Sequence, residues 1–209
     1  MFDAKLEFMR AVRGHAKRLN PDFVLFGETI SPETREVLDG YYPNRFLDER
    51  GRIHRYLFPE IRQQAVLVGN YGYDQVNKAL QLGIGAETEI WGLRKTCLAA
   101  CPELARYMGE VNRFKRKYAD LLIRGAFRDI VGAKVKGDVF HSILESADGR
   151  KALVLRNPHN RPQKVLAAIQ GADRGRFIIW HPFRKERTLG RMPVAVSVGP
   201  HEAAAVLLL

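Results

Sequence analysis

A carboxylate at the end of a short apolar run is the residue best placed to do chemistry in this sequence. Residues 23–28 read Phe-Val-Leu-Phe-Gly-Glu, a β-type run that stops at Glu28. Ser31-Pro32 follows and signals the start of a helix. Parallel α/β enzymes present catalytic groups at the carboxyl ends of such strands, so Glu28 is a candidate catalytic or ligand-binding residue. The alternative is a carboxylate that caps the following helix or pairs with a nearby arginine.

Three other carboxylates are candidates for a second acidic group. Glu60 follows Phe58-Pro59, and Glu87 and Glu89 lie in the run Glu-Thr-Glu-Ile-Trp-Gly. Glu87 and Glu89 alternate along an expected strand, so they share one face of it. Only the one nearer the strand's end would reach a central pocket. Each of the three also fits an ion pair with arginine.

The cysteines and histidines do not indicate a metal centre or a disulfide framework. Cys97 and Cys101 are four residues apart in a stretch that reads as helix, which fits a pair of reduced thiols. Neither has a histidine or a further cysteine close in sequence, as a metal site would need. The histidines are scattered, and we expect no metal and no cofactor.

The elements that must position Glu28 form a strand–helix pattern over residues 1–132. The spacing of apolar residues, turn signals and prolines predicts the following elements. They are helices over 2–19, 31–38, 73–82, 93–100 and 102–123, strands over 23–26, 40–43, 65–69 and 84–91, and a polar loop over 44–56.

The pattern changes beyond residue 132. Apolar runs at 139–144 and 152–155 flank Asp148-Gly149, which is a hairpin signal. Short apolar runs continue at 165–169, 177–180, 194–198 and 203–209. Several short strands at such spacing indicate an antiparallel sandwich, so we place a domain boundary near Gly132.

Composition bounds the function classes. The chain has 209 residues, 46% of them hydrophobic, a formal charge of +11 and a pI of about 9.9. The charge permits binding to nucleic acid or another polyanion, but the basic residues are scattered and carry no RNA-binding or zinc-finger signature. No run reaches the length of a membrane span. The amino terminus lacks the order of a secretion signal, so we expect a soluble, cytoplasmic chain as written.

The order of these parts resembles the carboxyl-terminal half of a glycoside hydrolase of the α-galactosidase-like group. Residues 151–158, Lys-Ala-Leu-Val-Leu-Arg-Asn-Pro, are similar to a strand of such an enzyme's β-domain that runs into an Asn-Pro turn. Residues 193–207, Pro-Val-Ala-Val-Ser-Val-Gly-Pro-His-Glu-Ala-Ala-Ala-Val-Leu, are similar to its closing hairpin.

The resemblance implies an α/β plus all-β fold. Residues 1–132 would hold the last three or four strand–helix units of a partial (β/α)₈ barrel, and 133–209 a small antiparallel β-sandwich. About 130 residues are too few to close a barrel of eight units. The chain would therefore need a missing amino-terminal barrel segment or self-association to cover its open sheet edges.

The resemblance also implies roles for particular residues. In such enzymes one carboxylate protonates the leaving oxygen, and the other attacks the sugar or activates water. Glu28 matches the first role by position, as a general acid/base. The nucleophile usually comes from an earlier strand, which would lie before Met1. Aromatic rings near strand ends could stack on sugars and polar side chains could bind hydroxyls, although such aromatics are as often packing residues. The expected substrate-binding residues are Tyr41, Tyr42, Arg45, Asn70, Tyr71, Glu89 and Trp91, with Tyr73 as a further aromatic.

Three functions follow in order of preference. The first is a glycoside-hydrolase-like fragment or subunit that acts on or binds carbohydrate. The second is a non-catalytic carbohydrate-binding or interaction module, or a degenerate remnant. The third, a basic nucleic-acid-binding protein, rests on charge alone. The sugar, the linkage and the retaining or inverting outcome are not readable from the residues, because the separation of the two carboxylates decides the last.

Overall fold

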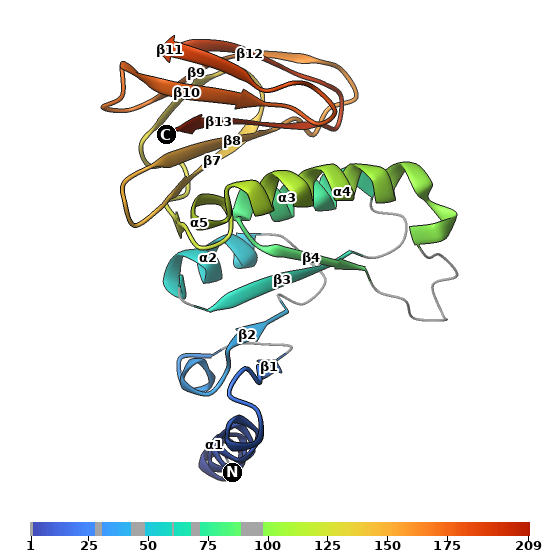
Figure 1. The fold of residues 1–209 in the computed structure, drawn as a ribbon, viewed down its shortest axis with the longest axis vertical. Helices are drawn as coiled ribbons and strands as arrows, with labels where there is room; N and C mark the ends of the chain where they lie inside the picture. Colours follow the sequence, from blue (N-terminus) through green and yellow to red (C-terminus); the bar gives the residue numbers. More distant parts are fainter. Residues whose placement is uncertain (1, 28–30, 43–48, 60, 68–71, 89–97) are drawn as a thin grey trace.

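Helices, a parallel sheet and two antiparallel sheets follow one another through the molecule (Figure 1). The computed structural model describes residues 2–27, 31–42, 49–59, 61–67, 72–88 and 98–209, with the backbone alone at 2, 3, 49, 50, 65–67, 87 and 88. Figure 1 places helix α1 at one end of the molecule and the antiparallel sheets at the other. The predicted mixture of an α/β part and a later all-β part is confirmed at this level.

Four short strands form a parallel sheet in the order of the chain. They are β1 (Phe26–Gly27), β2 (Gly40–Tyr41), β3 (Arg62–Leu67) and β4 (Gly85–Thr88). Each strand pairs in parallel with the next one along the sequence. Because all four run in the same direction, their carboxyl ends meet at one edge of the sheet.

Helical segments connect and flank these strands. They are α1 (Phe2–Leu19), η1 (Thr34–Glu36), α2 (Glu49–Leu57), α3 (Gly72–Leu82), η4 (Leu98–Ala100), α4 (Pro102–Lys117) and α5 (Ala119–Leu122). The helix predicted over 31–38 is only the 3-10 turn η1. The helix predicted over 102–123 is interrupted at Tyr118, which ends α4 and precedes α5.

Helix α2 contradicts the predicted polar loop 44–56 over residues 49–56, while residues 44–48 lie outside the described residues. The prediction failed because the residues that α2 buries are not its apolar ones. Ile53, Tyr56 and Leu57 are exposed, whereas Arg55 is 3% exposed. A helix whose buried face carries an arginine gives no apolar stripe for sequence periodicity to detect.

Nine strands in the second part form two antiparallel sheets. The six-stranded sheet has the order β11 (Arg187–Arg191), β10 (Arg174–Trp180), β13 (Ala203–Leu208), β8 (Lys151–Arg156), β7 (Phe140–Glu145) and β5 (Ala126–Phe127). The three-stranded sheet has the order β12 (Val194–Val198), β9 (Gln163–Ile169) and β6 (Ala133–Lys136).

The central strands of the six-stranded sheet are buried on both faces. In β8, Ala152 and Val154 pack toward helices α3, α4 and α5, while Leu153 and Leu155 pack toward the three-stranded sheet. Successive side chains of a strand point to opposite faces, so a strand covered on both sides is a continuous apolar run. The rings of Phe114 and Trp180 stack 4.0 Å apart between α4 and this sheet.

The structure confirms the predicted hairpin and the turn after it. β7 and β8 pair antiparallel across the Asp148-Gly149 turn. Asn157, directly after β8, is fully buried, and its amide donates to the carbonyls of Arg161, Val198 and Gly199. One side chain thereby joins the turn after β8 to the turn before β13.

Three strands were not predicted. β5 has two residues, and β6 has two lysines among its four. β11, Arg-Thr-Leu-Gly-Arg, is an edge strand with four of its five residues exposed, so it has no apolar alternation. None of the described helices is long and apolar enough to span a membrane.

Candidate functional site

The carboxyl edge of the parallel sheet is the candidate site. The chain leaves β1 after Gly27, β2 after Tyr41, β3 after Leu67 and β4 after Thr88, all at the same edge. The residues predicted to act on a substrate follow these four strand ends in the sequence. Six of them lie outside the described residues, namely Glu28, Arg45, Asn70, Tyr71, Glu89 and Trp91. Glu60 and the side chain of Glu87 also lie outside them.

Tyr41 and Tyr42 are the two predicted binding residues that the structure describes. Tyr41 is 1% exposed in a small core with Phe58 and Ile61, and its ring meets the edge of His54 at 5.7 Å. Burial raises the pKa of the Tyr41 hydroxyl. This placement fits the packing alternative. Tyr42 is only half-buried and lies 5.5 Å from the Phe26 ring, beside the end of β1.

Ser31 and Thr34 hold the described segment that leads to η1 in a tight turn. Ser31 and Thr34 cap one another: the Ser31 amide donates to Thr34 Oγ1 at 2.8 Å, and the Thr34 amide donates to Ser31 Oγ at 3.2 Å. Ser31 thus caps the turn that leads into η1, but η1 itself begins at Thr34 with Glu33 as its N-cap. A hydrogen bond from Ser31 lowers the pKa of the exposed Glu33 carboxyl.

Asp39 fixes the position of β1 relative to α1. Its carboxylate accepts hydrogen bonds from the Leu25 amide at 3.0 Å and from Arg13 at 2.8 Å, and Lys17 lies 3.6 Å away. Partial burial raises the pKa of Asp39, but the hydrogen bond from Arg13 and the other contacts outweigh it and hold the pKa below its usual range.

A buried hydrogen-bond network joins the helices to the antiparallel sheets. The Tyr107 hydroxyl donates to Asn77 Oδ1 at 2.6 Å and accepts from the Ala203 amide at 3.3 Å. The Asn77 amide donates to the carbonyl of His201 at 2.8 Å. The network therefore connects α3, α4 and the turn before β13.

Tyr107→Phe is expected to lower the free energy of unfolding by about 1–2 kcal/mol, because a buried amide group then loses a partner. Chemical denaturation of the two proteins measures the loss. Tyr118→Phe, whose half-buried hydroxyl bonds Glu186, is the control and should change stability by less than about 0.5 kcal/mol. Equal losses in the two variants would contradict the role of the network.

An ion-pair cluster around Arg156 holds α3 against β8. Arg156 donates to Asp74 at 2.5 Å and to the Gln81 side chain at 2.9 Å. Burial raises the pKa of Asp74, but the nearby charges of Arg156 and Lys78 outweigh it and keep the pKa below its usual range. Because Asp74 lies in the first turn of α3, this cluster fixes the helix that begins at the site edge.

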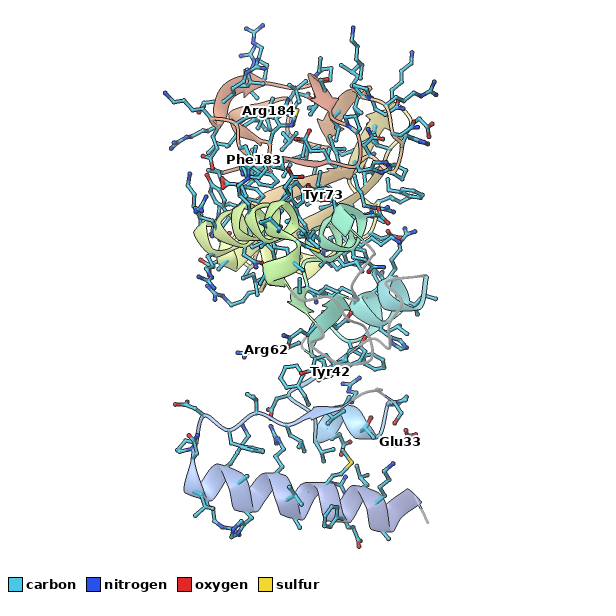
Figure 2. The ribbon with its side chains drawn as sticks, turned by 90° about the vertical axis from the view of Figure 1, so that its right-hand side faces the viewer. Glu33, Tyr42, Arg62, Tyr73, Phe183 and Arg184 are labelled. Atoms are coloured by element: carbon cyan, nitrogen blue, oxygen red, sulfur yellow. The ribbon has the colours of Figure 1, made fainter. Side chains whose placement is uncertain are left out.

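Phe183 had no role predicted from the sequence. It is an exposed aromatic residue close to Tyr107 of the buried hydrogen-bond network. It lies in the turn between β10 and β11, is 52% exposed and has a φ of 57°. The Arg106 guanidinium lies over its ring at 4.8 Å, and the Tyr107 ring lies 6.2 Å away. Figure 2 shows Tyr73, Phe183 and Arg184 near one another where the helices meet the antiparallel sheets. The available sequence signal was a phenylalanine in the polar turn Pro-Phe-Arg-Lys.

The described part of the chain has no cluster of side chains that could bind a metal ion. No three histidine, cysteine, aspartate or glutamate side chains there are close enough to hold a metal ion. Cys101 is a free thiol, and Cys97 lies outside the described residues.

Comparison with known proteins gives structural likeness alone. No protein-family model matches the chain, and no curated protein matches it in sequence. An α-amylase from Geobacillus thermoleovorans is similar over 98% of this chain and 57% of its own, with 13% identity and a TM-score of 0.64. A GH27 β-L-arabinopyranosidase from Geobacillus stearothermophilus is similar over 97% and 53%, with 14% identity and a TM-score of 0.56.

An α-galactosidase from Mortierella vinacea is similar over 85% of this chain and 55% of its own, with 12% identity and a TM-score of 0.52. The chain thus spans little more than half the length of the enzymes it matches. At these identities the likeness concerns the fold, and the chain has the fold of the corresponding part of these glycoside hydrolases.

Proposed function

We propose that this chain is part of a glycoside-hydrolase-like protein that acts on or binds carbohydrate. One observation carries the proposal: four parallel strands in chain order, then antiparallel sheets, in an order matched over nearly the whole chain by carbohydrate-active enzymes. On this proposal residues 1–132 are the last strand–helix units of a (β/α)₈ barrel, and residues 133–209 are a β-sandwich that packs on it.

Glu28 is the proposed general acid/base. It follows the carboxyl end of β1, the edge at which barrel enzymes place catalytic groups. A protonated Glu28 would give its proton to the glycosidic oxygen as the bond to the anomeric carbon breaks. Water or a second carboxylate would attack that carbon and form the new bond. Tyr42, Arg45, Asn70, Tyr71, Glu89 and Trp91 follow the neighbouring strand ends and are the proposed sugar-binding residues.

The open side of the parallel sheet supports a barrel completed by further strands. Among the described strands β1 pairs only with β2, so its other edge has free amide and carbonyl groups. Phe8 and Leu19 of α1, and Val24 in the segment before β1, are exposed apolar residues. An amino-terminal barrel segment or a second copy of the chain would cover both features, because a closed barrel has no edge.

Hydrolysis of aryl glycosides by the purified chain tests the catalytic part. We expect Glu28→Gln to reduce the rate at least about tenfold, since proton transfer by a positioned acid contributes more than this. Glu33→Gln, five residues further along and exposed, is the matched control and should keep the wild-type rate. Equal rates in the wild type and both variants would contradict the role of Glu28.

A non-catalytic carbohydrate-binding module is the second candidate. It is favoured by the small number of strands, because glycoside hydrolysis needs two carboxylates that usually come from different barrel strands. Retention of the chain on a polysaccharide column without any turnover of aryl glycosides would support this function over the enzyme.

A further inference from the structure

We propose that Phe183 and the cations around it form a second carbohydrate site, which binds uronate residues of acidic polysaccharides. The carbohydrate class rests on the proposed function, and the acidic class rests on the charges at this site. The site lies in the turn between β10 and β11, where α3 and α4 meet the antiparallel sheets, and Figure 2 shows Phe183 well away from Tyr42, which directly follows β2.

Phe183 is held in a conformation that packing alone does not explain. Its φ of 57° lies in the left-handed region, which costs a bulky residue free energy that glycine would avoid. The core gains little from this ring, because half of its surface faces water. Strained backbone at an exposed side chain is typical of binding sites, where the strain positions a contact group.

The Phe183 ring contacts the Tyr107 ring, and the Arg106 guanidinium lies over it. Tyr107 lies 6.2 Å away, and Tyr73 lies 4.7 Å from Tyr107, so aromatic rings continue toward the carboxyl edge of the parallel sheet. The hydroxyl of Tyr107 is fixed by Asn77 and Ala203. The rigid support fits a ring that must stay in place for a ligand.

The site has more cationic side chains than carboxylates paired with them. Arg184 lies 3.3 Å from Glu202, and Glu186 is paired with Lys117. Arg106 and Lys185 have no ion pair among the described residues, although Glu103 lies one turn before Arg106 on α4. Burial and the neighbouring Arg184 and Arg187 lower the pKa of His181 to about 4, so that imidazole adds no charge at neutral pH.

A uronate has the two features that this site would recognise. Its pyranose ring presents a face of C–H groups that can pack on an aromatic ring, and its carboxylate can accept charge-assisted hydrogen bonds from arginine or lysine. A neutral sugar would use only the ring. A nucleotide would offer a base and a phosphate instead, and is the competing ligand class.

Binding of the full chain to polygalacturonate at low salt is the test, with the methyl-esterified polymer as a ligand that differs only in charge. We expect the esterified form to bind at least about tenfold more weakly, and added salt to weaken binding of the acidic form. Phe183→Gly should weaken binding of the acidic polymer at least about tenfold without lowering the melting temperature, because glycine accepts the left-handed φ. Arg106→Gln should weaken binding of the acidic form alone.

Two matched variants control for general effects. Phe140→Ala removes another half-exposed phenylalanine that carries a stacked arginine, and Arg113→Gln removes another exposed arginine of α4. Both should bind polygalacturonate as the wild type does. Wild-type affinity in Phe183→Gly, equal affinity for the two polymers, or tighter binding of a single-stranded oligonucleotide would each overturn the proposal.

The same assay separates this site from the one at Glu28. Glu28→Gln should bind polygalacturonate normally, and Phe183→Gly should keep any hydrolysis of small aryl glycosides. Loss of hydrolysis with intact polymer binding would therefore leave the uronate site standing, and loss of polymer binding alone would leave the catalytic proposal standing.

Discussion

Arg55→Met is expected to lower the free energy of unfolding by about 3 kcal/mol. The Arg55 guanidinium of α2 is 3% exposed and donates to three backbone carbonyls, those of Leu82 at 3.2 Å, Pro59 at 2.8 Å and Gly125 at 2.6 Å. Methionine fills a similar volume but donates nothing, so three carbonyls would lose a donor inside the protein.

Loss of Arg55 should destabilise several segments of the chain, because its hydrogen bonds join them. Its partners lie at the end of α3, after α2 and before β5, so one side chain joins three segments of the chain. The carbonyl of Leu82 ends α3, where the helix dipole favours a cation. Burial lowers the pKa of Arg55, yet arginine remains charged at neutral pH.

Urea denaturation measures this loss. Arg62→Met, at an exposed position on β3, is the control and should change stability by less than about 0.5 kcal/mol. A loss of under about 1 kcal/mol in Arg55→Met would mean that the cost of burying the guanidinium cancels its hydrogen bonds.

Lys115→Met is expected to have the opposite effect and to raise stability at pH 7 by about 1–2 kcal/mol. Lys115 of α4 is also buried, at 4% exposed, but among the described residues its one hydrogen-bond acceptor is the carbonyl of Ile84. Burial lowers its pKa from 10.5 to about 8. This shift corresponds to a cost of about 3 kcal/mol when the lysine is charged, which one hydrogen bond offsets only in part.

The pH dependence identifies the cause. Below pH 8 Lys115 is charged in both the folded and the unfolded chain, so the full cost is present. Between pH 8 and 10.5 the unfolded chain binds more protons, and the stability of the wild type rises relative to the variant. Between pH 7 and pH 10 the wild type should therefore gain about 2 kcal/mol relative to Lys115→Met, so the advantage of the variant should be gone by pH 10.

Denaturation at both pH values tests this expectation. Arg116→Met, at the next and exposed position of α4, should show little change and no such slope. A constant difference between the wild type and Lys115→Met across this range would show that the ammonium group is not desolvated in the fold.

Local sequence signals determined much of the second part of the chain. Strands β7, β8, β9, β10, β12 and β13 were predicted because their apolar residues come in runs separated by turn residues such as Asp148-Gly149. A strand covered on both faces carries its own signal, since burial requires apolar residues at successive positions. Edge strand β11 has no such requirement and was missed.

For the candidate site, the sequence determined which residues follow which strand. Ser31 and the run that ends at Gly27 gave the turn after β1 and the position of Glu28 in the chain. The sequence did not separate the buried Tyr41 from the half-buried Tyr42, because neighbouring positions of one type differ only in the face of the sheet they occupy.

Only the tertiary structure decided where the buried polar groups and the exposed aromatic lie. Arg55 and Lys115 look like surface residues in sequence, and both are buried because partners from distant segments close around them. Phe183 had no predicted role, and the tertiary structure leaves it 52% exposed in a left-handed conformation, with Arg106 over its ring. Burial depends on contacts between residues far apart in the chain, and local composition does not contain that information.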